Sequence, residues 1–370
     1  MDRVESFMDL TSTQRVLIYR LGSLGDMVVA LPALHLIKQS FPRARRLLLT
    51  NHPVHAKAPA ASAVLGNSGL VDGFISYPVG ARSFMPLAKL WWQIARFRPQ
   101  VLVYLAASRG DDHVKRDARF FRACGISKII GLPLGPSAKS TYFPETELWE
   151  HESARLSRMI RSLGTCDLDD KRSWDLGLTD EEKKSARNAL SGLGGAPYVV
   201  CGAGTKMQAK DWGKENWRKL LTRLSAEMPD RALVMVGAKE DAEVSDYAAS
   251  EWRGSVGNLC GGLSVRESAA VMSNAELFMG PDSGPMHLAA AVGVPCACVF
   301  AARDKPGAWY PMGQANRVIY HRVDCMQCYL ETCVVQKKKC LTSITVDEVF
   351  SAAMDAWKSG KKAAFTEDRV

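Results

Sequence analysis

One stretch near residue 280 restricts the fold more than any other part of the chain. An apolar run at 277–279 leads into a short polar turn, and an apolar helix at 286–292 is followed by a second apolar run at 296–301. Buried strand, tight turn, short helix and buried strand in this order indicate a parallel α/β sheet. The turn suits a diphosphate, because free backbone N–H groups and a helix dipole converge there. An ordinary turn capped by Asp282 and Ser283 would give the same pattern.

The start of the chain shows the same alternation. Residues 15–21 are typical of a buried strand, and a glycine-spaced loop at 22–26 follows. Apolar residues at helical spacing over 28–37 and a strand at 47–49 complete a βαβ unit of the doubly wound kind. The loop is not a P-loop, since no Gly-Lys-Ser/Thr follows it. Asp26 at its end suits the N-cap of any such turn.

The length of 370 residues suits two domains. The segment 163–178 is polar and rich in aspartate with no apolar period, so we place the boundary there. We predict an N-terminal domain over 1–170, a C-terminal domain over 171–345, and a closing helix and tail over 346–370 that returns to the first domain. A strand at 198–201 opens the second doubly wound domain.

Composition limits the class of protein. Hydrophobic residues make up 47% and charged residues 24%, as in a soluble globular protein. The first residues lack the layout of a signal peptide and no apolar run is long enough to span a bilayer, so we expect a cytoplasmic protein. The formal net charge of +9 implies an anionic partner: nucleic acid, anionic lipid or a phosphorylated glycan.

A helix at 87–97 has two interpretations. Its apolar side chains form a narrow stripe, which favours a core helix that covers the next strand, 101–105. Trp92, Arg96 and Arg98 lie off this stripe, and a helix on a membrane surface is the alternative.

Three motifs span nearly the whole chain. They are R-L-G-S-L-G-D at 20–26, K-D-W at 210–212, and D-S-G-P-M-H-L-A-A-A-x-G-x-P at 282–295 with W-Y-P-M-G after it. Together they resemble glycosyltransferase family 9, which includes the ADP-heptose lipopolysaccharide heptosyltransferases. The resemblance implies a GT-B fold: two Rossmann-like doubly wound domains facing a central cleft, with the donor on the C-terminal domain and the acceptor on the N-terminal one.

The resemblance also implies the site residues of an inverting glycosyl transfer. Asp26 would be the catalytic base, and Lys210 would contact the donor diphosphate. The donor-binding positions that it implies are Thr205, Lys210, Leu263, Asp282, Ser283, Gly284, Met286 and His287. His287 is either a donor contact or a packed helix residue. Arg109 and Arg116 of a basic helix would bind an anionic acceptor, and a solvated charged face is the alternative there.

Four of the ten cysteines cluster as Cys325-x2-Cys328-x4-Cys333-x6-Cys340. Four thiols this close in a cytoplasmic chain favour a structural zinc site over disulfides, although the second gap is unusually short. Reduced thiols are the alternative. Catalysis is expected to need no cofactor, because no Asp-x-Asp pair follows a convincing buried strand.

We therefore expect a transferase that moves heptose from ADP-heptose onto a lipopolysaccharide core or a related anionic glycan or glycolipid. Peripheral contact with the inner face of the inner membrane fits this role, and no nucleic acid is expected. The loop at 301–305 departs from the usual heptosyltransferase pattern, so a transferase with another nucleotide sugar is one alternative. A non-catalytic, zinc-stabilised nucleic-acid-binding protein on the same scaffold is the other.

Overall fold

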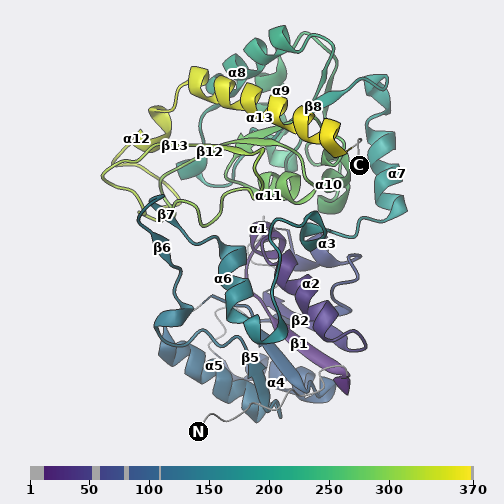
Figure 1. The fold of residues 1–370 in the computed structure, drawn as a ribbon, viewed down its shortest axis with the longest axis vertical. Helices are drawn as coiled ribbons and strands as arrows, with labels where there is room; N and C mark the ends of the chain where they lie inside the picture. The colour runs from purple at the N-terminus through teal and green to yellow at the C-terminus, as the bar shows by residue number, and fades with distance from the viewer. Residues whose placement is uncertain (1–11, 52–58, 79–82, 108–109, 368–370) are drawn as a thin grey trace. The chain divides into compact units, whose positions relative to one another are not determined.

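The computed structural model describes residues 12–51, 59–78, 83–107 and 110–367. The chain forms two compact units (Figure 1). Unit 1 comprises Met1–Thr141 and Glu152–Ser173, and unit 2 comprises Tyr142–His151 and Trp174–Val370. The chain therefore contributes a short segment to unit 2 before it completes unit 1.

Unit 1 is built on a five-stranded sheet in the order β3-β2-β1-β4-β5. Its strands are β1 (Arg15–Tyr19), β2 (Arg45–Asn51), β3 (Gly73–Tyr77), β4 (Val101–Tyr104) and β5 (Lys128–Ile130). All neighbours run parallel. The order reverses between β1 and β4, which is the point where doubly wound sheets place their functional loops.

The helices of unit 1 lie between these strands. They are α1 (Leu24–Val28), α2 (Leu31–Ser40), α3 (Ala61–Leu65), α4 (Phe84–Phe97), α5 (Asp111–Ala123) and α6 (Glu152–Met159). The single helix predicted over 28–37 is two helices. Pro32 lies in the first turn of α2, where its missing N–H leaves no bond unmade, so the proline starts a new helix.

Unit 2 contains a six-stranded sheet in the order β10-β9-β8-β11-β12-β13, and its neighbours are parallel throughout. Its strands are β8 (Tyr198–Cys201), β9 (Ala232–Met235), β10 (Val256–Asn258), β11 (Phe278–Pro281), β12 (Cys296–Phe300) and β13 (Arg317–Tyr320). The order reverses between β8 and β11. Both sheets are thus of the doubly wound kind that the sequence predicts.

The helices of unit 2 are α7 (Asp180–Ala189), α8 (Lys214–Glu227), α9 (Ala242–Ala249), α10 (Val265–Met272), α11 (Gly284–Ala291), α12 (Lys339–Thr342) and α13 (Val346–Glu367). An antiparallel hairpin, β6 (Tyr142–Phe143) and β7 (Leu148–Trp149), also belongs to this unit. The last helix, α13, belongs to unit 2, where it packs on α8, β12 and β13 (Figure 1). Among the described residues, none of the helices combines the length and apolar character that crossing a bilayer requires.

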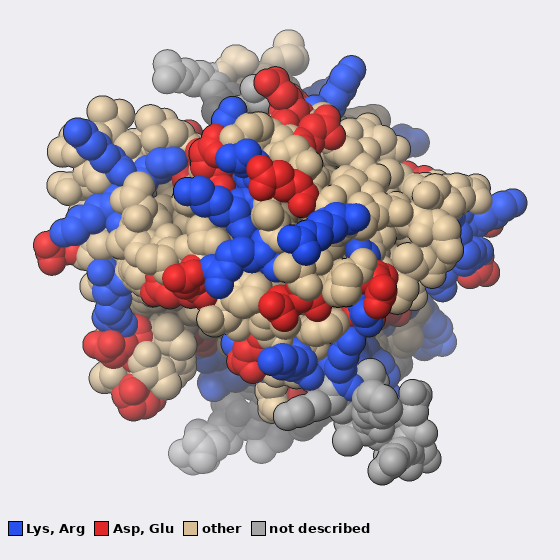
Figure 2. All heavy atoms as spheres, turned by 90° about the horizontal axis from the view of Figure 1, so that it is seen from above, with Lys and Arg blue, Asp and Glu red and all other residues tan. Residues whose placement is uncertain are grey.

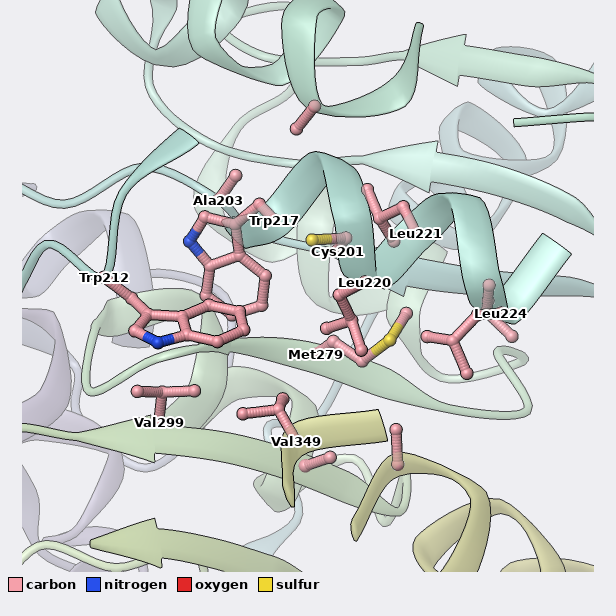
Figure 3. Close-up of a cluster of buried hydrophobic side chains, with 14 of the residues drawn as sticks. Cys201, Ala203, Trp212, Trp217, Leu220, Leu221, Leu224, Met279, Val299 and Val349 are labelled. Carbon is pink, nitrogen blue, oxygen red and sulfur yellow. The ribbon is translucent and has the colours of Figure 1, made fainter. Parts of the chain in front are cut away.

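The core of unit 2 lies between the sheet and helices α8 and α13 (Figure 3). Trp212 and Trp217 meet edge to face with ring centroids 4.9 Å apart. The indole of Trp212 also donates to the carbonyl of Ile344, 3.1 Å away, so the start of α8 is fixed to the segment that leads into α13. This packing holds the loop before Trp212 in place.

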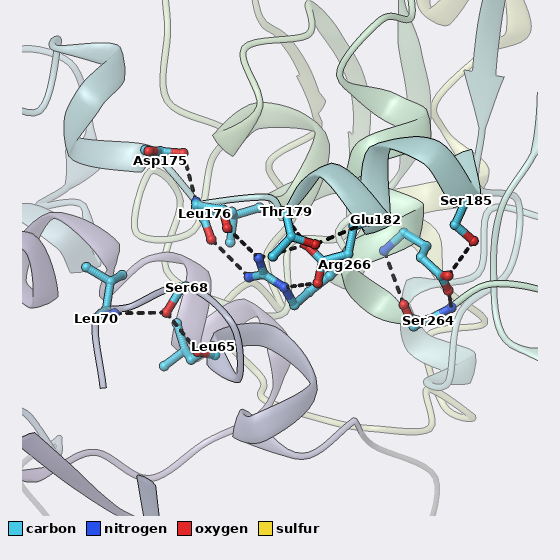
Figure 4. A network of polar contacts seen from close by, with 12 residues as sticks. Leu65, Ser68, Leu70, Asp175, Leu176, Thr179, Glu182, Ser185, Ser264 and Arg266 are labelled. Carbon is cyan, nitrogen blue, oxygen red and sulfur yellow. Dashed lines mark hydrogen bonds and ion pairs between the residues drawn. The ribbon is translucent and has the colours of Figure 1, made fainter. Parts of the chain in front are cut away.

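A buried ion pair joins α10 to α7 in the same unit (Figure 4). Arg266 Nε lies 2.6 Å from Glu182 Oε1, and the guanidinium also donates to the carbonyls of Leu176 and Gly177. Burial makes such a pair costly unless every donor has a partner, and these backbone acceptors supply them. Ser264 and Glu267 form a capping box at the start of α10.

Charge is mixed in sign on the face that Figure 2 shows. Figure 2 shows lysine and arginine side chains interspersed with acidic ones rather than gathered in one patch. On α8, Arg218 pairs with Glu215 and Glu251, and Arg223 pairs with Asp347. The positive net charge therefore does not form a broad nucleic-acid-binding surface on the face that Figure 2 shows.

Candidate functional site

The predicted base, Asp26, lies in the first turn of α1 in unit 1. Its Oδ2 accepts hydrogen bonds from the backbone N–H and the hydroxyl of Ser23, at 2.8 and 3.2 Å. The turn is so tight that a Cβ on Gly22 (φ 138°) would lie 2.2 Å from Asp26 Cγ. Only glycine fits there, which explains the glycine that precedes the capping serine.

A buried arginine, Arg20, contacts Asp26, and the sequence motif gave no sign of this role. The Nη2 of Arg20 lies 3.5 Å from Asp26 Oδ1, and Arg20 Nε donates to the Asp26 carbonyl. The same guanidinium bonds Glu152 at 2.9 Å. The Asp26 side chain keeps 29% of its surface exposed while Arg20 keeps 2%. A partly accessible carboxylate is thus oriented by a side chain that solvent does not reach.

Glu152 on α6 completes this cluster. Burial alone would raise the pKa of its carboxyl, but the hydrogen bonds from Arg155 and the charge of Arg20 lower that pKa to about 2. Two arginines therefore face one buried carboxylate that stays ionised. Arg20 and Glu152 are separated by 132 positions, so no local sequence pattern could have predicted that they pair.

In unit 2, five loops follow the carboxyl ends of parallel strands and so meet at one edge of the sheet. Loops after β8, β9 and β10 carry Thr205, Asp241 and Leu263, respectively. Loops after β11 and β12 carry Asp282 and the pair Arg303 and Asp304. Asp241 lies against the first of these loops, because a Cβ on Gly204 would come within 2.2 Å of its carboxylate. We call this edge the donor edge, after the donor-binding residues that the family resemblance predicts for it.

The turn after β11 differs in detail from the prediction. Ser283 is the N-cap of α11, yet its side chain makes no capping bond, and Asp282 does not cap the helix either. The Ser283 hydroxyl is buried without a hydrogen-bond partner among the described residues. A buried hydroxyl without a partner is costly, and here it lies beside the unpaired N–H groups of the first turn of α11.

Asp282 binds the predicted lysine instead. Lys210 Nζ lies 2.6 Å from Asp282 Oδ2 and 3.8 Å from Asp304 Oδ2. Lys210 ends a short 3₁₀ turn, Gln208–Lys210, in the loop after β8. Its ammonium is thereby held at the start of α11, between two carboxylates.

Arg303 and Asp304 lie beside Lys210 at the donor edge, and the sequence singles them out only as part of a loop that departs from the family pattern. Arg303 Nη1 lies 2.6 Å from Asp304 Oδ2. Arg303 Nε and Nη2 donate to the carbonyls of Leu330 and Tyr329 at 2.7 and 2.9 Å. The signal that could have found them is their place directly after a buried strand at the donor edge.

The cysteine-rich segment, residues 325–340, forms hydrogen bonds with the loop that carries Lys210. Its Glu331 carbonyl accepts from the N–H of Ala209, and its Cys333 N–H donates to the Gln208 side chain. Lys338 Nζ donates to the carbonyl of Asp211 at 2.7 Å. The segment therefore connects the loops after β8 and β12, which carry the two sides of the lysine site.

His287 and Met286 of α11 face away from solvent. Burial lowers the pKa of His287 to about 4, so its ring is neutral at pH 7. The ring meets Trp309 edge to face at 6.2 Å. Met286 is fully buried, so any contact of that position with a ligand falls to its backbone N–H. Gly284, the first residue of α11, offers a ligand only backbone.

The remaining predicted residues fall elsewhere. Arg109 lies outside the described residues. Arg116 on α5 is 62% exposed and pairs with Asp117 at 3.2 Å. All four clustered cysteines, Cys325, Cys328, Cys333 and Cys340, carry free thiols. No three potential metal ligands come together anywhere in the described ranges, so the residues do not fit the predicted zinc site, which is not confirmed.

Sequence comparisons point in one direction. The family described as glycosyltransferase family 9 (heptosyltransferase) matches residues 123–339. Lipopolysaccharide heptosyltransferase 3 of Escherichia coli is 32% identical over 299 residues, which are 76% of this chain and 81% of that protein. Lipooligosaccharide heptosyltransferase 2 of Campylobacter jejuni is 22% identical, with coverage of 91% and 96%.

Solved structures of similar fold agree. A family 9 glycosyl transferase from Veillonella parvula has a TM-score of 0.69 at 16% identity, covering 94% of this chain and 98% of its own. An E. coli ADP-heptose heptosyltransferase II gives 0.64 at 17% identity, covering 94% and 100%. An E. coli heptosyltransferase with ADP-2-deoxy-2-fluoro heptose gives 0.62 at 16%, covering 91% and 98%. The predicted class, GT-B with two Rossmann-like units, is confirmed.

Proposed function

Because the chain belongs to glycosyltransferase family 9, we propose that it transfers heptose from ADP-heptose to a sugar hydroxyl of a lipopolysaccharide core. The names of its relatives and the ADP-sugar bound in one similar structure support this donor and this acceptor class. The observation that carries the proposal is the donor edge, where Lys210 and the buried Ser283 hydroxyl meet the N-terminus of α11.

In the proposed reaction, Asp26 accepts the proton of the acceptor hydroxyl. The acceptor oxygen forms a bond to the anomeric carbon while the bond from that carbon to the diphosphate oxygen breaks, which inverts the configuration. ADP leaves with the bonding electron pair. Asp26 suits the role of general base because Ser23 and Arg20 fix the carboxylate while part of it remains exposed.

The leaving diphosphate gains negative charge, and the donor edge supplies positive groups to stabilise it. Lys210 is the charged group, and the first-turn N–H groups of α11 add partial positive charge. The Ser283 hydroxyl, which has no hydrogen-bond partner among the described residues, can donate a hydrogen bond to the diphosphate. In this proposal the protein's own groups do the work, and no cofactor takes part.

We assign donor binding to unit 2 and acceptor binding to unit 1, close to the predicted domains 1–170 and 171–345. Thr205 and Leu263 would line the nucleotide end of the donor site. Exposed Arg116, with Arg109, would attract the anionic acceptor. Because a glycolipid acceptor is anchored in a bilayer, we place the enzyme at the cytoplasmic face of the inner membrane, in peripheral contact with it.

The proposal is tested by incubating the protein with ADP-heptose and heptose-deficient lipopolysaccharide core. ADP release and a product heavier by one heptose are expected, as read by mass spectrometry. A panel of other nucleotide sugars separates the two parts of the proposal. Transfer only from another donor would overturn the heptose assignment, and no transfer from any donor would overturn the activity itself.

A further inference from the structure

Helix α4 exposes a row of large apolar side chains in unit 1. Phe84, Met85 and Trp92 keep 82%, 76% and 56% of their surface exposed, and Leu87 and Trp91 keep about two-fifths. These five form the largest group of exposed apolar side chains on any one helix among the described residues. The core stripe predicted for this helix is consequently narrower than expected: only Leu90 and Ile94 are fully buried.

The helix geometry puts two of these apolar residues, Met85 and Trp92, on one face together with two basic residues. Leu90 and Ile94 pack into the core cluster of the unit 1 sheet. Met85, Lys89, Trp92 and Arg96 follow one another at i, i+4, i+7 and i+11, which aligns them along the opposite side of the helix. We call these four residues the α4 face, and we group with them Phe84, which is the first residue of the helix and precedes Met85 in the chain.

The charge on this face has one sign. Lys89 and Arg96 are both exposed, and the Arg96 guanidinium lies over the Trp92 ring, 5.4 Å from its centroid. No aspartate or glutamate occurs anywhere between residues 73 and 110. The contrast with the mixed charge of the face in Figure 2 is clear.

A neighbouring helix adds to the basic character. Trp91 Nε1 donates to the carbonyl of Ala123 at 2.9 Å, so α4 touches the end of α5. Arg119 and Arg122, both exposed, lie in the last turns of α5. Both helices also contribute to the same core cluster, through Ile94 and Phe121.

We propose that the α4 face docks on a bilayer surface rich in anionic phospholipid. An exposed apolar and aromatic face with lysine and arginine on it is the pattern of a helix that lies in the lipid interface. The apolar side chains would enter the headgroup region, while the cations would meet lipid phosphates. A nucleic acid would explain the cations but would leave Phe84 and Met85 in water.

This inference makes the proposed membrane contact specific, and it does not depend on the transferase chemistry. Binding is measured by co-sedimentation with vesicles of phosphatidylcholine containing one-third phosphatidylglycerol, and with pure phosphatidylcholine. Wild type should bind the anionic vesicles and bind the neutral ones at least about tenfold more weakly. Phe84→Ser with Trp92→Ser should weaken binding at least about tenfold, and so should Lys89→Glu with Arg96→Glu.

A matched control comes from unit 2. Val334 and Val335 are 72% and 86% exposed, and changing both to serine should leave vesicle binding unchanged. Circular dichroism must show that every variant is folded. Failure of wild type to bind anionic vesicles, or equal weakening in the valine variant, would overturn the proposal. Loss of self-association in the α4 variants, with vesicle binding intact, would overturn it in favour of a contact between copies.

The assay keeps the two proposals apart. Transfer to a lipid-free core oligosaccharide should be unchanged in the α4 variants, because none of these residues belongs to the proposed catalytic or donor groups. Vesicle binding by a protein that transfers no heptose would leave the docking surface standing and remove only the transferase assignment.

Discussion

Lys210 Nζ and Asp282 Oδ2 lie 2.6 Å apart, although 72 positions of sequence separate the two residues. The pair connects the loop after β8 to the turn before α11 across the switch point of the unit 2 sheet. Both side chains are largely buried, at 15% and 7% exposure. The lysine is therefore held in place before any donor arrives, and Asp282 is the group that holds it.

Lys210→Ala should weaken donor binding and slow transfer together, because the lysine faces phosphate charge in the bound donor and in the leaving group. It should also lower the free energy of unfolding by about 3 kcal/mol, since Asp282 is left buried without its partner. Calorimetric titration with ADP and urea denaturation measure the two effects. The exposed Lys219→Ala on α8 is the matched control.

Adding Asp282→Asn to Lys210→Ala separates stability from function. The neutral amide removes the unpaired charge, so most of the lost stability should return, while donor binding should stay weak. If donor binding recovered along with stability, Lys210 would have only a structural role.

Asp26→Asn should leave ADP binding nearly unchanged and reduce turnover by roughly 10²–10⁴-fold. The amide oxygen can still accept from Ser23, so stability should stay close to wild type. Asp169→Asn, an exposed carboxylate in unit 1, serves as the control. Normal turnover by a folded Asp26→Asn protein would remove Asp26 from the mechanism.

Arg303→Gln should raise KM for the donor more than it lowers kcat. The change breaks the bonds to Leu330 and Tyr329, so Asp304 loses its anchor and the Lys210 site loosens. Steady-state kinetics with varied donor measures this split, and Arg303→Lys should restore part of the donor affinity. Arg218→Gln on α8 is the control, and an equal rise in KM there would contradict the role of Arg303.

The free energy of unfolding should fall as the pH drops from about 6.5 to about 4, because His287 is protonated more readily in the unfolded chain. Burial lowers the pKa of this histidine to about 4 in the folded protein, whereas its ordinary value is about 6.5. The unfolded chain therefore binds more protons in this window, and stability is present above it and lost as the pH falls. Asp282, His151 and Lys210 face the ring and modulate this pKa.

His287→Gln should flatten the slope of unfolding free energy against pH, a change on the order of 3 kcal/mol across the window. Glu152, with a folded pKa of about 2, loses its stabilising effect only below about pH 4.5, so measurements between pH 4.5 and 6.5 isolate the histidine. An unchanged slope in the variant would show that another group titrates there.

A chelator should leave the melting temperature unchanged. The four clustered cysteines carry free thiols and form no metal-binding group among the described residues. Metal analysis should find less than one zinc per chain, and thiol titration of unfolded protein should count all ten cysteines. One tightly held zinc per chain, lost with a fall in melting temperature, would contradict the free-thiol arrangement.

Sequence patterns predicted the secondary-structure elements whose formation depends on neighbouring residues in the chain. The strand, turn and helix around residue 280 and the βαβ unit at the N-terminus follow from apolar periodicity and glycine spacing. The split of the predicted helix at Pro32 was missed, although proline at a first turn is itself a sequence signal. The family motifs named Asp26 and Lys210, but not the groups that hold them.

Those supporting groups depend on long-range pairing. Arg20 meets Glu152, and Arg303 meets the carbonyls of Leu330 and Tyr329, and in neither case does periodicity indicate the partner. The zinc prediction is not confirmed, and it too concerns long-range arrangement. Spacing suggested four converging thiolates, but it gave no sign of the hydrogen bonds that join this segment to the Lys210 loop.

The interrupted path of the chain between the units has a consequence during synthesis on the ribosome. Hairpin β6–β7 is made before unit 1 is complete, yet its partners belong to unit 2: Trp149 N–H donates to the carbonyl of Pro306, and Lys305 lies over the Trp149 ring. The hairpin therefore stays without these partners until β12 and the loop after it, which carries Lys305 and Pro306, have been synthesised. By then all five strands of the unit 1 sheet have been made, so that sheet can form before the hairpin is packed.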